Sequence, residues 1–344
     1  MKIFLFAILT ALLASCPGAG AAQADDSGLY AGEIPVADQS VSEQRRGMPL
    51  ALEQVLQKLS GLRSFEGYPE VKPALRNASA MAITFYYRNR ELTLADGTLG
   101  SELNLVVDFS RPAVDSLLQT LQLPSWKPER RALITWVIVD DGTGRRIMPI
   151  ELEYARQAVA VAASARGMPL SWPQPDEAGN YPVDLQLLWG GYTEELVSNG
   201  PVDTLVMAAR QEGPEWNVRM NLDYTGQKWT WRNRNADIQT ALVEGMQTAI
   251  DDITGINSIA ASDQGQKLME LTITGVLGTG DYVKVLSYLQ SLSLIDHVQV
   301  SGAAPGKVRF VLTLNALPEY LVRALASDNV LSATAIADVY TLSP

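Results

Sequence analysis

The chain has 344 residues, of which 47% are hydrophobic and 19% charged, so it can bury a sizeable core and is not a disordered tail. One Cys and one His exclude a Cys/His zinc site, an iron–sulfur cluster and a disulfide framework, and we expect neither a metal nor a cofactor. The formal net charge of −11 repels phosphates, which argues against a nucleic acid partner.

Residues 1–24 have the order of a secretory signal, with Lys2, an apolar run over 3–14 and then small residues. The run is shorter than the roughly 20 residues that a membrane-spanning helix needs. Two processing sites compete. Residues 22–24 fit cleavage after Ala24, whereas residues 13–16 resemble a lipobox that ends in a lipidated Cys16. Either route places the mature chain outside the cytoplasm.

Breaks in composition divide the rest of the chain into three modules of the α/β and α+β classes. In chain order the segments are an N-terminal βα module at 25–123, a linker at 124–131, a middle α/β domain at 132–257, a linker at 258–266 and a C-terminal domain at 267–344.

The N-terminal module begins with an apolar strand at 29–36 and a helix whose apolar residues include Leu52, Val55 and Leu59. Ser42 is the predicted N-cap of this helix, and Gly61 ends it. The patterns that follow predict strands at 82–87 and 103–109 and a helix over 114–121.

The middle domain opens with a continuous apolar run at 132–139, which is typical of a strand buried on both faces. A helix ended by Gly167, a short strand, a helix capped by Asp184 and another buried strand then give a βαβ rhythm. Alternating residues, Trp229 and Trp231 among them, predict a β-hairpin, and a long amphipathic helix covers 238–253.

The C-terminal domain shows the β-α-β-β-α-β order of the ferredoxin-like arrangement. Its predicted strands are 267–275, 297–301, 307–314 and 331–342, and its predicted helices are 281–292 and 317–326. Gly275, Gly278 and Gly280 have the wrong spacing for a phosphate-binding loop, so we expect a simple turn with Asp281 as N-cap. We interpret His297, which has no second His or Cys beside it, as a structural residue.

Three pairs of adjacent acidic residues are the candidates for catalysis by paired carboxylates. They are Asp140/Asp141, Glu194/Glu195 and Asp251/Asp252. Carboxylates of glycosidases face each other across the substrate, which neighbours in sequence do not do. We therefore interpret the first pair as part of a turn and the others as solvated helix surface, and we assign no catalytic residue.

The segment Trp189, Gly190, Gly191 and Tyr192 is the candidate binding element. The glycines allow a sharp turn and close approach of backbone, which leaves Trp189 and Tyr192 free to line a groove. The alternative is that Trp189 belongs to the core and the glycines only end a helical turn.

Several stretches resemble the domain-of-unknown-function family two-thousand-and-sixty-six. They are residues 34–40, 55–61, 117–126, 133–142 and 189–192. The resemblance implies an exported protein of a Gram-negative bacterium and carries no catalytic residue. Gly47 and Pro49 depart from it, because they interrupt a segment where a continuous helix is usual. The middle domain is also similar, in the order of its elements, to periplasmic adaptor domains of the TolB N-terminal and curli-secretion lipoprotein type.

We therefore expect a non-catalytic periplasmic protein, soluble or anchored to the outer membrane by lipid at Cys16, that binds another envelope protein. We expect no nucleic acid partner and no transmembrane span in the mature chain. One alternative is an envelope hydrolase that acts on glycan or peptide through paired carboxylates. Another is a small-ligand or lipid-binding protein, which needs a large apolar pocket near Trp189 or between domains.

Overall fold

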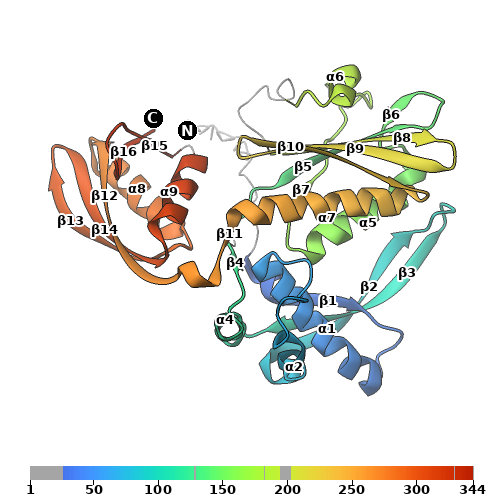
Figure 1. Cartoon of the computed structure of the whole chain (residues 1–344), viewed down its shortest axis with the longest axis horizontal. Helices are drawn as coiled ribbons and strands as arrows, with labels where there is room; N and C mark the ends of the chain where they lie inside the picture. Colours follow the sequence, from blue (N-terminus) through green and yellow to red (C-terminus); the bar gives the residue numbers. More distant parts are fainter. Residues whose placement is uncertain (1–25, 128, 182, 194–202, 329, 344) are drawn as a thin grey trace, which may run out of the picture.

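The computed structural model describes residues 26–127, 129–181, 183–193, 203–328 and 330–343. Its architecture is mixed α/β and α+β, as predicted: three larger sheets lie side by side, each with helices packed on it and its own hydrophobic core (Figure 1). Within these ranges no helix combines the length and the apolar character that a membrane crossing requires. The two predicted processing sites, Cys16 and Ala24, lie outside the described residues.

The N-terminal module packs a long helix on a small antiparallel sheet of order β1-β3-β2. Its elements are η1 (Asp26–Tyr30), β1 (Ala31–Pro35), α1 (Val41–Ser60), α2 (Val71–Leu75), α3 (Ala78–Met81), β2 (Ala82–Thr93), β3 (Leu99–Phe109) and α4 (Arg111–Thr120). The predicted apolar face of α1 is buried, since Leu52 and Val55 have no exposed surface. The burial of this face holds the helix on the sheet.

Helix α1 begins two residues earlier than predicted. Its N-cap is Ser40, whose Oγ accepts a hydrogen bond of 3.3 Å from the backbone N of Glu43, so the prediction of Ser42 is wrong. A Ser, Thr or Asp at either position fits the sequence rule, and the side-chain geometry decides between them. The predicted end at Gly61 is confirmed, with a left-handed φ of 75° that favours glycine.

Residues 47–49, which left the start of this helix open in the sequence, lie inside α1, because the helix begins at Val41 and continues through Pro49. Gly47 is buried against β3, and a Cβ there would lie 2.8 Å from the side chain of Leu105. The glycine therefore permits close packing of helix on sheet. Pro49 costs the helix one backbone hydrogen bond but does not end it.

Strands β2 and β3 are 12 and 11 residues long, so they extend well beyond the predicted 82–87 and 103–109. Their outer halves form the β2–β3 arm (residues 88–104), which reaches from the N-terminal module to a helix of the middle domain (Figure 1). There the backbone N of Thr93 donates to the side chain of Gln157 over 2.9 Å, and the Gln157 amide donates back to Thr93 Oγ1 over 3.2 Å. The arm is therefore fixed at both ends.

The middle domain is built on a sheet of order β10-β9-β8-β5-β6, with β7 also paired to β5. Its elements are β5 (Leu133–Asp140), β6 (Arg145–Ile147), η2 (Ile150–Leu152), α5 (Glu153–Ala165), β7 (Leu170–Ser171), α6 (Leu185–Gly190), β8 (Thr204–Glu212), β9 (Glu215–Tyr224), β10 (Gln227–Asn235) and α7 (Ile238–Asn257). Strand β5 is parallel to β7 and β8, and β9 and β10 form the predicted hairpin. Helices α5 and α7 cover one face, and the short α6 lies over the other (Figure 1).

The C-terminal domain has a sheet of order β13-β14-β12-β16-β15. Its elements are β12 (Gln264–Val276), α8 (Thr279–Ser291), β13 (Ile295–Ala304), β14 (Gly306–Ala316), α9 (Pro318–Ser327), β15 (Leu331–Ala333) and β16 (Val339–Leu342). Strand β14 lies between β12 and β13 and is antiparallel to both, which is the predicted split βαβ unit.

Two details of this domain differ from the prediction. The expected strand at 331–342 is two strands separated by a turn, with Asp338 at a φ of 59°, and as a result β16 runs parallel to β12. Asp281 is not the N-cap of α8, because the helix begins at Thr279. Its carboxylate instead accepts hydrogen bonds from the backbone N atoms of Leu277 (2.9 Å) and Gly278 (3.1 Å).

The segment 124–131, expected as a linker, is packed between the modules. Its strand β4 (Ser125–Trp126) pairs with β11 (Ser258–Ile259), which η4 (Ala261–Asp263) follows. Arg130 is 6% exposed and donates hydrogen bonds of 2.6 Å to the carbonyls of Lys58 and Gly167.

A second buried arginine, Arg166, is 3% exposed and donates to the Gly61 carbonyl (2.6 Å), to Asp251 (2.8 Å) and to Gln247 (2.7 Å). Arg130 and Arg166 thus both donate to carbonyls at the C-terminal end of α1, where a helix has acceptors without internal partners. They join the N-terminal module rigidly to the middle domain.

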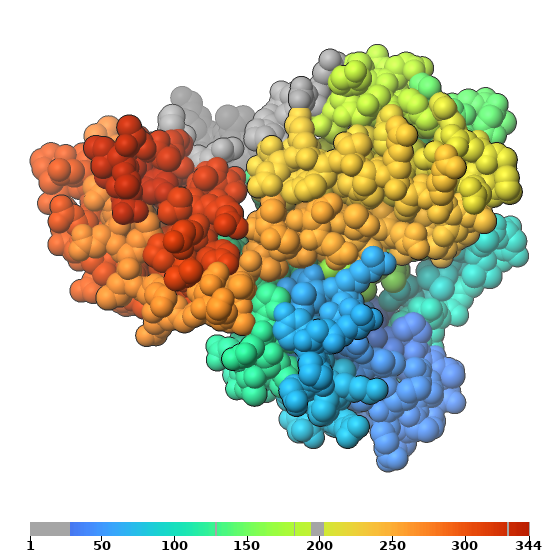
Figure 2. Space-filling model, viewed as in Figure 1, coloured from blue at the N-terminus to red at the C-terminus, as the bar shows by residue number. Residues whose placement is uncertain are grey.

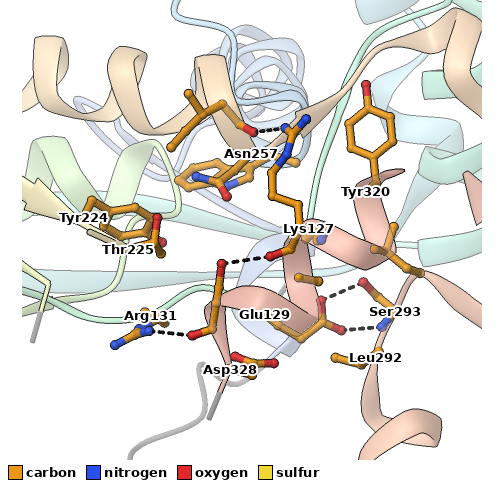
Figure 3. A pocket seen from close by; sticks show the side chains of 16 residues that line it. Lys127, Glu129, Arg131, Tyr224, Thr225, Asn257, Leu292, Ser293, Tyr320 and Asp328 are labelled. Carbon is orange, nitrogen blue, oxygen red and sulfur yellow. Dashed lines mark hydrogen bonds between the residues drawn. The ribbon is translucent and has the colours of Figure 1, made fainter. Parts of the chain in front are cut away.

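The C-terminal domain meets the middle domain through polar contacts around a small space of about 80 Å³ (Figure 3). The carboxylate of Glu129 accepts hydrogen bonds from the backbone N (2.7 Å) and Oγ (2.6 Å) of Ser293. Arg131 donates to the carbonyl of Ser327 over 3.1 Å, and Arg323 donates to that of Ile256 over 2.6 Å. The space has room for a few water molecules, and the residues around it hydrogen-bond to one another. We therefore interpret it as a structural junction between the two domains.

Candidate functional site

The predicted binding element lies on α6, over the face of the middle sheet that α5 and α7 leave uncovered. As predicted, Asp184 caps α6: its carboxylate accepts from the backbone N atoms of Gln186 (2.7 Å) and Leu187 (3.3 Å). Gly191 ends the helix with a left-handed φ of 84°. The short helix therefore has a fixed start and a fixed end.

Trp189 lies at the boundary between the interior and the surface. The preceding Leu188 is fully buried in a small cluster with Trp136, Ile138 and Val206, and Trp189 packs against the edge of that cluster. Trp189 is only half-buried, and Tyr192 is 62% exposed. The helix is thus anchored by one side chain and presents two aromatic rings near the surface.

Beneath Trp189 the sheet presents cations. Strand residues alternate between faces, and on β9 Val218 and Met220 point to the core under α7. Arg219, between them, therefore points to the α6 face. In register with it lie Ala208 of β8 and Arg232 of β10.

We call this surface the arginine face: Arg145, Arg210, Arg219 and Arg232, with Trp189 above them. The guanidinium of Arg145 lies 4.5 Å from the centre of the Trp189 ring, and that of Arg210 lies 5.3 Å from it. Both are cation–π distances. Asp140 faces this pair of cations at 3.9 Å from Arg145 and 3.6 Å from Arg210, and Gln186 also accepts from Arg145.

Arg219 is the least compensated charge of the face. Its Nε and Nη2 atoms are enclosed and have no hydrogen-bond partner among the described residues. Burial, and then the charges of Arg232, Arg210 and Arg145, lower the pKa of its guanidinium. Within the described part of the chain neither Arg219 nor Arg232 forms an ion pair with a carboxylate. An enclosed cation beside like charges is costly unless an anion joins it.

The space next to Trp189 suits a small anionic group. It measures about 130 Å³, and its lining consists of Trp189, Arg210, Arg219 and Arg232 of the arginine face together with Ala208, Glu212 and Asn217. A second space of about 90 Å³ adjoins Gly191, Tyr192 and Asn221, and the Nδ2 of Asn221 is another enclosed donor without a partner in the described structure. Neither space is large enough for the lipid pocket that the sequence placed near Trp189 as one alternative.

The acidic pairs that the sequence offered for catalysis lie in structural contacts where they are described. Asp141 accepts hydrogen bonds from Thr143, which together with Arg146 lower the pKa of its carboxyl to about 2. Asp251 pairs with Arg166, and burial and the neighbouring Asp251 raise the pKa of Asp252. Glu194 and Glu195 lie outside the described residues.

His297 is exposed on β13, opposite Thr313 of β14. A grouping of three or more His, Cys, Asp or Glu side chains suited to a metal ion is absent from the described ranges.

Comparison with known families corrects the sequence interpretation. A model for a domain of unknown function (DUF8605) matches residues 21–127. This is not family two-thousand-and-sixty-six, which the sequence analysis named. That assignment is therefore wrong. The match covers the N-terminal module and β4, and it ends before the arginine face. No curated protein matches the chain.

Proposed function

We propose that this protein is a non-catalytic binding module of the cell envelope that works in the periplasm and holds an acidic segment of a partner protein on the arginine face. The observation that carries the proposal is the uncompensated charge of Arg219 among Arg145, Arg210 and Arg232. The chain has a net charge of −11, yet four guanidinium groups lie together on this face. The face is therefore a local site of positive charge on an acidic protein.

A protein segment fits this surface better than an isolated ion does. Trp189 and the exposed Tyr192 supply the aromatic anchors that are common in protein interfaces. Asn217 and Asn221 lie on the same face of β9 as Arg219 and offer amide groups to a bound backbone. The guanidinium groups would then hold carboxylates, for which their fork geometry is suited.

The test is a titration calorimetry experiment with the mature protein and a short poly-glutamate peptide at low salt. Arg219→Gln and Arg232→Gln should each weaken binding roughly tenfold, because each removes a charge-assisted hydrogen bond. The matched control is Arg309→Gln, because Arg309 is an exposed arginine on β14 of the C-terminal domain, away from the arginine face. Equal losses for all three variants would reflect net charge alone and would overturn the proposal.

The cellular counterpart uses a photoreactive residue in place of the exposed Tyr192 in the full-length chain. Support requires a cross-link to an acidic stretch of an envelope protein that disappears with Arg219→Gln and persists with Arg309→Gln. Cross-linking to polysaccharide or lipid instead would refute the proposed class of partner. Fractionation of the same cells tests the periplasmic location, and labelling with radioactive palmitate tests the lipid on Cys16.

A further inference from the structure

A large cleft lies between the N-terminal module and the middle domain. It has a volume of about 850 Å³, which is within the range of small-molecule sites. Strand β1 and helix α1 form its base, α5 and α7 form one wall, and the β2–β3 arm forms the other. In Figure 2 it is the hollow between the blue N-terminal module, the teal arm and the body of the middle domain.

One wall of the cleft is apolar and comes from α5. Ala155, Val159 and Ala163 of this helix pack into the core of the middle domain. A second apolar stripe lines the cleft, at the i, i+3, i+4 and i+7 spacing of one helix face. It consists of Ala158, Val161, Ala162 and Ala165. Val161 is 40% exposed, and Val243 of α7 and Leu92 and Leu94 of the arm extend the apolar surface.

The opposite wall is polar and carries excess positive charge. Arg88 and Arg90 on the arm both pair with Glu33 of β1. Burial opposes ionisation of Glu33, but these two arginines outweigh it and lower the pKa of the carboxyl. With Lys58 and Glu102, the lining has three cations and two carboxylates.

Lys58 leaves one donor free. Its ammonium donates to the carbonyls of Gly28 (3.2 Å) and Ala31 (2.7 Å), which uses two of its three N–H bonds. The two arginines likewise have more N–H groups than Glu33 can accept. The polar wall therefore offers hydrogen-bond donors and net positive charge to whatever occupies the cleft.

The arm holds the walls apart at a fixed distance. Gln157 of α5 joins Thr93 of the arm through two hydrogen bonds, while Arg130 and Arg166 join the two modules at the other end. A cleft braced at both ends is formed before a ligand arrives, which lowers the entropic cost of binding.

We propose that this cleft binds a single-chain amphiphile with an anionic head, either a carboxylate or a phosphate. The apolar chain would lie along the Ala158–Ala165 stripe, and the head would meet Arg88, Arg90 and Lys58. This site is independent of the arginine face, because it lies on the other side of the middle sheet and uses none of its residues.

The test measures binding of three probes to the mature protein by titration calorimetry: laurate, dodecyl phosphate and the neutral dodecyl maltoside, each below its micellar concentration. We expect laurate or dodecyl phosphate to bind at least tenfold more tightly than the maltoside. The two anionic probes separate a fatty-acid head from a phosphate head. Equal binding of all three, or no binding of either anion, would overturn the proposal.

Two variants locate the site. Val161→Glu should reduce binding of the anionic probes more than tenfold, because it places a carboxylate on the apolar wall. Its matched control is Val322→Glu on α9 of the C-terminal domain, since Val322 is also 40% exposed. Arg88→Gln should weaken the anionic probes and leave the maltoside unchanged. Identical affinities for Val161→Glu and Val322→Glu would refute this location.

Discussion

Replacement of Arg219 by Met should make the folded protein more stable. Arg219 keeps two enclosed N–H-bearing nitrogens without partners among the described residues, beside three like charges. A buried polar group without a hydrogen-bond partner destabilises the folded state by about 1–3 kcal/mol. The penalty is smaller for Arg219, because its side chain is only half-buried. Met retains the packing of the aliphatic stem without the charge. The expected gain in the free energy of unfolding is therefore about 1 kcal/mol at low salt.

The assay is urea unfolding of wild type and variant, followed by tryptophan fluorescence, at low ionic strength and in concentrated NaCl. Salt shortens the screening length from about 10 Å at 0.1 M to about 3 Å at 1 M, so the part of the gain that comes from repulsion should shrink. Arg234→Met, which removes an exposed ion pair, should stay within about 0.5 kcal/mol of wild type. If Arg219→Met is less stable than wild type at low salt, Arg219 has a partner and the binding argument fails.

Further predictions concern the junction, the N-terminal packing and pH. Arg166→Met should lower the unfolding free energy by about 3 kcal/mol, because three acceptors lose a buried charged donor, and hydrogen exchange in the last turn of α1 should accelerate. Gly32→Ala should destabilise by more than about 2 kcal/mol in thermal unfolding, since its Cβ would overlap the backbone of α1, whereas Gly67→Ala, with open space around it, should be neutral. Burial lowers the pKa of both Lys58 and Lys127 from 10.5 to about 8. The unfolded chain therefore holds more protons between pH 8 and 10, so the unfolding free energy should rise with pH in that window, and the double Met variant should flatten the rise.

Much of the fold follows from local patterns. The continuous apolar run of β5, the α1 stop at Gly61 and the cap at Asp184 each depend on residues close in sequence. The predicted N-caps Ser42 and Asp281 lie two and three positions after the observed ones, Ser40 and Gly278, because several residues near a helix start satisfy the same rule.

Part of the arginine face could have been predicted from the sequence. The alternation of apolar and polar residues along β9 and β10 predicts a hairpin whose apolar residues face the core. The polar residues between them, which include Arg219 and Arg232, must then point to the opposite face. Arg145 was missed because β6, only three residues long, was not predicted, although it pairs with β5 across the turn at residues 141–144. A pocket between domains was one of the alternatives that the sequence left open, but its lining could not be predicted, because it depends on how two modules meet.

The junction built by Arg130 and Arg166 makes the N-terminal module dependent on sequence far downstream. A fragment that ends at residue 127, where the family match ends, lacks both arginines and the strand β11 that pairs with β4. The carbonyls of Lys58 and Gly61 would then face water, and Trp126, which is buried in the whole chain, would lose its cover. The family match therefore ends inside a packed junction, and a protein with a similar N-terminal module but a different sequence after it would need other residues to cover this surface.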